Sequence, residues 1–350
     1  MRPVVCAALV ALLCLHSSLA FAETDRDPRA LNVSIALFDP GVPEDLATQR
    51  DLQVFPRIRE IEAKFLPFVL RETLANSGEW GAVRVVPEPD PAAELLVLGT
   101  IERSDGEVLI LKVRAVDASG RTWFDETFSG RVANTVAEGE RGQQQLYNTI
   151  AARLLAARAE RDEQTLRSLE GISLMRYANE LAPSAFESYL GQDEDGHYRI
   201  LRLPARDDPM LDRIERIRGV EYVITDAVDA KYQELHAEIE SVYELWREHR
   251  RKSLEYQAED ERRLNEPPSN LPRGSYDALQ NIYDNYKWHR MTEQEQDSLA
   301  VAFNNEVGPI VDRIETRVGE LDGWVEEQYA EWNRLLEELF EVETRLQQPQ

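Results

Sequence analysis

The stretch that decides the fold is Glu94–Gly130, ELLVLGTIERSDGEVLILKVRAVDASGRTWFDETFSG. Two segments typical of tight turns, Ser104–Glu107 and Ala118–Arg121, divide it into three runs. Each turn contains a glycine, which can adopt the positive φ that short hairpin turns require. Every second residue of the middle run is apolar, as in a strand with one buried face; these residues are Leu109, Leu111, Val113 and Ala115. The stretch therefore predicts a three-stranded antiparallel meander.

A meander cannot bury its apolar face alone, so the flanking segments must cover it. Strands are expected at residues 31–38 and 80–86, with an amphipathic helix between them from about residue 56 to 75. Pro67 lies inside this helix and is expected to kink it, because proline removes one backbone donor. A second amphipathic helix is expected after the meander, at residues 144–157. These elements predict an α+β fold, with one mixed sheet and helices on one face.

The layout resembles the N-terminal domain of TolB, and relatives such as CsgG and LpoB share it. The residues that carry the resemblance are ANSGEWGAVRVVPEP at 75–89, Leu98-Gly99-Thr100 in the first meander strand and the turn Val116–Gly120. The similarity covers roughly residues 31–157, and we assign residues 23–157 to this TolB N-terminal-like domain. The resemblance implies an envelope protein that works by contact and not by catalysis.

The first 22 residues are typical of a secretory signal peptide that is cleaved after about Ala22. Arg2 precedes a short apolar run, Val4–Leu15, and a small-x-small cleavage pattern follows it. An uncleaved anchor is the alternative, but the apolar run is short for a bilayer span. Both cysteines, Cys6 and Cys14, lie in this segment, and neither follows the small residue of a lipoprotein cleavage site. We therefore expect an exported, periplasmic protein without disulfides, lipid anchor or membrane span.

The formal net charge of the chain is -25. Nucleic acids and anionic lipids are polyanions, so an acidic surface disfavours them as general partners. The composition thus predicts no nucleic-acid partner.

Residues 158–225 are expected to form a helical connector. Asp193–Gly196 is a polar turn between two possible short strands. A helix is expected to begin at Asp208-Pro209, with aspartate as its N-cap, and to end at Gly219.

Residues 226–350 carry the second strong pattern. It predicts a long antiparallel helical hairpin over residues 226–346. Apolar residues recur there at alternating spacings of three and four, as on a coiled-coil seam. The seam residues are Val228, Tyr232, Leu235, Ile239, Val242, Trp246 and His249, and then Val311, Ile314, Val318, Leu321, Val325, Gln328, Trp332, Leu335, Leu339, Val342 and Leu346. A linker with three prolines separates the two runs.

Two sets of polar residues on this hairpin are candidate sites. Arg247, Arg250, Arg251 and Lys252 form a basic cluster that could dock an acidic partner, or anionic peptidoglycan or lipid, although a solvated helix face is the simpler interpretation. His249 and Gln328 fall at similar heights of the predicted hairpin. They could form a buried polar layer that fixes its register, or each side chain could extend to solvent.

Other candidate chemistry is weak. His236 and Glu240 share a helix face, but no third ligand follows at metal-like spacing. Asp193 and Asp195 resemble part of a calcium loop, whose twelfth position is occupied by Arg202, so an ordinary turn is favoured. No nucleophile-elbow, P-loop or dinucleotide-binding motif occurs. We expect no catalytic residues, cofactor or metal.

Three functions follow as hypotheses. The first is a non-enzymatic periplasmic scaffold or adaptor that binds an envelope protein partner. The second is a self-assembling component of a secretion or outer-membrane assembly complex, which would require a homo-oligomer. The third is a hydrolase of cell-wall glycan, for which nothing in the sequence places two carboxylates in a cleft.

Overall fold

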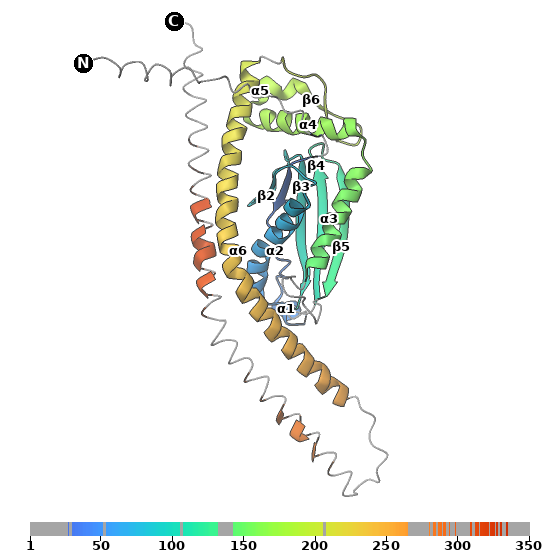
Figure 1. Cartoon of the computed structure of the whole chain (residues 1–350), viewed down its shortest axis with the longest axis vertical. Coiled ribbons are helices and arrows are strands. Elements are labelled where there is room, and N and C mark those ends of the chain that lie inside the picture. The colour runs from blue at the N-terminus through green and yellow to red at the C-terminus, as the bar shows by residue number, and fades with distance from the viewer. Residues whose placement is uncertain are drawn as a thin grey trace, which may run out of the picture.

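The computed structural model (Figure 1) describes residues 30–51, 54–105, 108–131, 143–205 and 208–264, together with residue 27 and scattered positions between 280 and 334. The predicted α+β class is confirmed: a five-stranded mixed sheet is combined with helices. No described helix is both long and apolar enough to cross a membrane.

The sheet has the strand order β2-β1-β3-β4-β5. Its central strand β1 pairs in parallel with both β2 and β3, whereas β3, β4 and β5 form the predicted antiparallel meander. The bounds are Val33–Ala36 for β1, Val83–Val86 for β2, Leu95–Ser104 for β3, Val108–Asp117 for β4 and Thr122–Arg131 for β5. The meander turn has the expected geometry, since Gly120 adopts φ +87° and the N–H of Asp117 donates to the carbonyl of Arg121.

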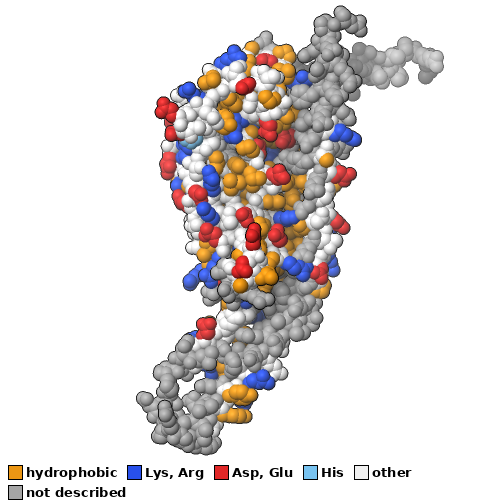
Figure 2. Space-filling view, turned by 180° about the vertical axis from the view of Figure 1, so that it is seen from behind, with side chains coloured by type: hydrophobic (Ala, Val, Ile, Leu, Met, Phe, Trp, Pro, Cys, Tyr) orange, Lys and Arg blue, Asp and Glu red, His pale blue; other side chains and the backbone are white. Residues whose placement is uncertain are grey.

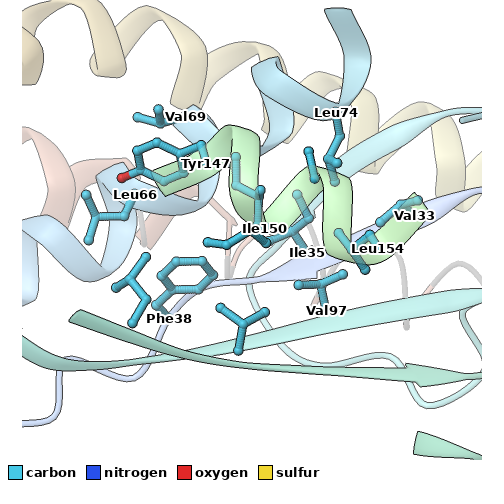
Figure 3. Packing of buried hydrophobic residues seen from close by; sticks show 14 of the residues in the cluster. Val33, Ile35, Phe38, Leu66, Val69, Leu74, Val97, Tyr147, Ile150 and Leu154 are labelled. Carbon is cyan, nitrogen blue, oxygen red and sulfur yellow. The ribbon is translucent and has the colours of Figure 1, made fainter. Parts of the chain in front are cut away.

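Two helices, α2 (Pro56–Ser77) and α3 (Gln144–Ala159), cover one face of this sheet. Figure 3 shows the strand residues Val33, Ile35 and Val97 facing Ile150 and Leu154 of α3, and Leu66 and Val69 of α2 belong to the same cluster. Helix α2 runs through Pro67 without interruption and ends at Gly78, which adopts φ +67°. All four apolar residues predicted to alternate along β4 are 0% exposed, so period-two alternation identified the buried face correctly.

Gly99 permits a close approach between β3 and the chain after β1. A Cβ atom at this position would lie 2.5 Å from a ring carbon of Phe38, which is closer than real Cβ contacts allow. Phe38 is 3% exposed and belongs to the main core cluster. The glycine of the Leu98-Gly99-Thr100 segment therefore has a packing role.

The opposite face of the sheet carries a small apolar cluster of its own. Ala36, Val86 and Leu96 alternate with the residues that face α2 and α3, and they cluster with Ala93 from the connection between β2 and β3. Leu98 is only partly buried beside them. Figure 2 views the molecule from behind and shows hydrophobic side chains gathered in the middle of this surface.

Beyond the sheet, the chain forms mostly helices, with one small two-stranded sheet. The bounds are α1 Leu46–Asp51, α4 Glu163–Leu181, α5 Pro183–Phe186, a 3-10 turn Glu187–Tyr189, β6 Leu190–Gln192, β7 Tyr198–Ile200 and α6 Pro209–Leu264. Strands β6 and β7 confirm the short strands expected around the turn at residues 193–196, where Gly196 adopts φ +84°.

Helix α6 is much longer than the predicted helix at its start. It is continuous over 56 residues, or about 84 Å. The predicted end at Gly219 is therefore wrong. A glycine inside a helix costs about 1 kcal/mol relative to alanine, and here the helix is stabilised on both sides because Ile214, Ile217 and Val228 are buried. Helix α6 thus crosses the predicted border between connector and hairpin at residues 225 and 226.

The C-terminal seam is described only in part. Ile314, Val318 and Val325 are buried and share apolar clusters with residues of α2 and α6. Arg57 of α2 also lies 2.5 Å from Asp312. Much of the run from residue 265 onward lies outside the described residues, so the complete antiparallel hairpin stays a prediction.

Candidate functional site at the junction of α6 and the head

We call the sheet with α2 and α3 the head. Helix α6 packs against the head at strand β2 and helix α2, and it also contacts α4. At the β2 edge, an Oδ1 of Asp229 accepts a hydrogen bond from the backbone N–H of Val85 at 3.4 Å. The other carboxylate oxygen lies 2.8 Å from Arg71 of α2. Burial raises the pKa of Asp229, and the charge of Arg71 opposes that rise. The Asp229 carboxylate of α6 therefore binds a backbone N–H group at this edge of the sheet.

A second contact at this edge involves Arg84 of β2, whose side chain points to α6. Its Nε lies 2.5 Å from an oxygen of Asp226, and its guanidinium lies 4.6 Å from the centre of the Tyr222 ring. Because Asp226 is more than half exposed, this ion pair orients the two side chains but contributes little to the stability of the fold.

Closer to the start of α6 lies the upper junction, formed by Ser173 of α4 and Arg218 of α6. Arg218 Nη2 donates to Ser173 Oγ at 2.6 Å and to the carbonyl of Ala92 at 3.4 Å. The Ser173 hydroxyl also donates to the Ala92 carbonyl. Ser173 is 0% exposed. This junction ties α6, α4 and the β2–β3 connection together through buried polar groups.

Beyond Asp229, further along α6, the helix packs against α2 through aromatic rings. The His236 ring stacks on Phe65, with ring centroids 4.5 Å apart and planes 11° from parallel. Tyr232 stacks on Phe68 at 5.4 Å, and Tyr243 lies 5.0 Å from Phe65. His236 is 5% exposed, so the structure places it in the core and not on a metal-binding surface with Glu240.

The lower junction comprises Glu62 of α2, Ser104 of β3, and Tyr243 and Arg247 of α6. The Ser104 hydroxyl donates a hydrogen bond to Glu62 Oε1. Complete burial raises the pKa of Glu62, against the effects of Ser104, Arg59, Tyr243 and Arg247. Burial likewise raises the pKa of Tyr243 well above its ordinary value. The junction is therefore a buried polar contact between three distant segments.

Arg59 supports Glu62 from the preceding turn of α2. Its Nε lies 3.7 Å from Glu62 Oε2, and its Nη1 donates to the carbonyl of Ile101 at 2.8 Å. Arg59 is 3% exposed, and burial lowers its pKa despite the neighbouring carboxylate.

The basic cluster predicted from sequence contains two buried residues and two that are more accessible. Arg247 is 4% exposed and Arg250 is 8% exposed, with the Arg250 guanidinium 5.3 Å from the centre of the Phe55 ring. Arg251 is half-buried and Lys252 is exposed, 2.8 Å from Glu248. Only the last two residues are therefore accessible to a partner, and a docking role for them stays a prediction.

The predicted polar layer of His249 and Gln328 cannot be compared with the structure. Gln328 and the side chain of His249 lie outside the described residues, so the pairing of His249 with Gln328 stays a prediction.

Asp193, Asp195 and His197 come together at the turn between β6 and β7, with one potential ligand atom from each within 4.8 Å of the others. Asp193 Oδ1 already accepts hydrogen bonds from the backbone N–H groups of Asp195 and His197, at 3.0 and 2.8 Å. Both aspartates are exposed. The geometry is that of an aspartate-stabilised turn, as favoured from sequence.

An open groove of about 440 Å³ lies between α2 and α3. Thr73 and Gln144 bridge its walls, since Gln144 Nε2 donates to Thr73 Oγ1 at 2.9 Å. Of the described residues that line it, Glu72 alone is titratable. These residues therefore offer no pair of groups for acid–base chemistry.

Comparisons with known proteins add little. No family model matches the chain, and no curated protein matches it. Among solved structures, the chain is similar to a PelC dodecamer from Paraburkholderia phytofirmans, with 15% sequence identity and a TM-score of 0.22. The match covers 37% of this chain and 90% of that chain. A likeness this low carries no argument about function, and the resemblance to TolB, CsgG and LpoB stays a prediction.

Proposed function

We propose that the protein is a non-enzymatic scaffold or adaptor of the cell envelope that acts by protein–protein contact. The observation that carries the proposal is the path of α6. The helix is fixed to the head at the upper junction, the β2 edge and the lower junction, and it then extends past the head (Figure 1).

Burial along α6 ends where the helix leaves the head. Arg250 is the last buried residue of α6, and every described side chain after it is half-buried or exposed. Residues 251–264, which we call the arm, would span about 21 Å. A helix that is anchored along most of its length and continues beyond the head with half-buried and exposed side chains suits a spacer that presents a contact surface.

The chemistry of the buried groups also supports a structural role. Among the described residues, the carboxyl groups whose pKa burial raises are Glu62, Glu221 and Asp229. Each interacts with a neighbouring element: Glu62 with Ser104, Glu221 with Tyr177 and Asp229 with Arg71. These contacts hold helices in place, so a glycan hydrolase receives the least support. A cleavage assay on purified cell-wall glycan would test that hypothesis.

The compartment rests on the predicted signal peptide, and the partner is therefore an envelope protein. The test is photo-crosslinking in cells with the crosslinker at Arg251 on the arm, at Arg114 on β4 and at Glu163 on α4 as a surface control. We expect a specific envelope protein from Arg251 on the arm and none from the control; capture from Arg114 alone would place the contact on the meander and contradict the role of the arm. Adducts of the chain with itself alone would contradict the adaptor proposal and favour the self-assembling alternative.

A further inference from the structure

The two edges of the sheet differ in a way that points to an interaction surface. At one edge, Asp229 of α6 covers β2. At the other edge, β5 pairs with β4 on one side, and the described part of the chain contains no strand on its other side. An edge strand directs backbone N–H and C=O groups outward at every second residue, which makes it a template for another strand. Strand β5 offers ten residues for such pairing.

The side chains of β5 alternate between a covered and an exposed row. Phe124 and Phe128 lie under α3, and Glu126 beside them is held by Arg153 of α3 at 2.9 Å. The other row faces away from the helices and is exposed throughout; it comprises Asp125, Thr127, Ser129 and Arg131. Strand β5 contains no proline and no lysine, the residues that often protect an edge from pairing.

This exposed row is complementary to itself. If two β5 strands pair antiparallel with Phe128 opposite Phe128 of a second copy, Asp125 lies opposite Arg131 and Thr127 lies opposite Ser129. Two-fold symmetry produces each of these pairs twice. Cross-strand pairs of opposite charge stabilise antiparallel sheets. Shifting the centre to Thr127 would instead place Asp125 opposite Ser129, and both charged pairs would be lost.

We propose that a second copy of this chain binds at β5 in this register and joins the two five-stranded sheets into one sheet of ten strands. Asp125 already lies 3.5 Å from Lys112 of its own β4, so Arg131 of the second copy would complete a small surface network of charges. The inference goes beyond the adaptor proposal, since it concerns the β5 edge and not the arm.

The test is the mass of the purified full chain in solution, measured by light scattering after gel filtration over a range of concentrations. We expect a species with twice the mass of a single chain. The variants Asp125→Arg and Arg131→Glu each place like charges opposite each other twice, so each is expected to weaken the dimer about tenfold or more. The double variant restores opposite charges with exchanged positions and is expected to recover the dimer. Asp195→Arg, in the β6–β7 turn, makes the same charge change away from β5 and is expected to leave it unchanged.

A chain that stays monomeric at every concentration would overturn the proposal, and so would a dimer that neither single variant weakens. Circular dichroism of each variant checks the fold, and the double variant separates charge pairing from misfolding, because a folding defect would not be repaired by a second exposed substitution. Loss of the dimer with retained crosslinking from Arg251 would leave the adaptor proposal intact, so the two proposals can fail separately.

Discussion

The hydroxyl of Ser104 donates a hydrogen bond to the carboxylate of Glu62 at a point where α2, β3 and α6 meet. Glu62 is 0% exposed and Ser104 is 5% exposed. A buried carboxyl group of this kind makes the stability of the contact depend on its protonation.

The first prediction concerns Glu62 and pH. Because burial raises its pKa above the ordinary value of 4.5, the folded chain holds this proton at pH values where the unfolded chain has released it. The contribution of Glu62 to stability is therefore fully present at low pH and is lost as pH rises through the folded pKa. Glutamine cannot ionise, so the free energy of unfolding of Glu62→Gln should rise relative to wild type as pH increases from about 4.5. Urea unfolding from pH 4.5 to 8 measures this. A difference that is constant with pH would contradict it.

The second prediction concerns the upper junction. Ser173→Ala removes the hydroxyl that accepts from Arg218 and donates to the Ala92 carbonyl, and it leaves buried polar groups with fewer partners. We expect a loss of about 1–3 kcal/mol in the free energy of unfolding. Ser168→Ala, on the same helix, removes a hydroxyl that bonds within its own helix, at Thr165, and should change stability by less than about 0.5 kcal/mol. Equal effects of the two substitutions would show that the contact with α6 adds nothing.

The third prediction concerns the approach of Phe38 to Gly99. A methyl group at Gly99 would overlap the Phe38 ring, so Gly99→Ala should lose about 1–3 kcal/mol of stability through overpacking. In a Phe38→Leu background, the same substitution should cost less, because the ring is absent. A double-mutant cycle measures this coupling. Additive effects of the two substitutions would refute the contact.

The fourth prediction tests the continuity of α6. Gly219 is exposed, and a Cβ atom there would meet no atom within 4 Å. Alanine is the better helix former, so Gly219→Ala should stabilise the protein by about 0.5–1 kcal/mol. If the helix instead ended at this glycine, alanine would destabilise the chain. Thermal unfolding distinguishes these two signs.

Local patterns were sufficient for the elements of the head. The alternation along β4 and the glycine of the turn that follows it, Gly120, are properties of neighbouring residues, and the structure reproduces them. The end predicted at Gly219 failed because a cost of about 1 kcal/mol is smaller than the gain from burying Ile214, Ile217 and Val228.

The junctions could be predicted only in part. Glu62 interrupts the apolar face of its helix between Ile61 and Phe65, and such a carboxylate signals a buried polar contact. Its partners Ser104 and Tyr243 are distant in the sequence, so no local pattern identifies them. On α6, the predicted seam contains Val228, Tyr232, Ile239 and Trp246, which are buried, but the buried face also includes His236, Tyr243 and Arg250. The face is wider than a two-helix seam because α6 packs on both the head and the described C-terminal residues.

The central claim is that the arm presents a contact surface to an envelope protein, and its accessible charges are the place to test it. The measurement is recovery of the partner after treatment of cells with a chemical crosslinking reagent, compared between wild type, the Arg251→Glu/Lys252→Glu variant and the control Arg199→Glu at an exposed residue of β7. The adaptor account predicts a clear loss of recovery for the arm variant and none for the control. Unchanged recovery from the arm variant would contradict it.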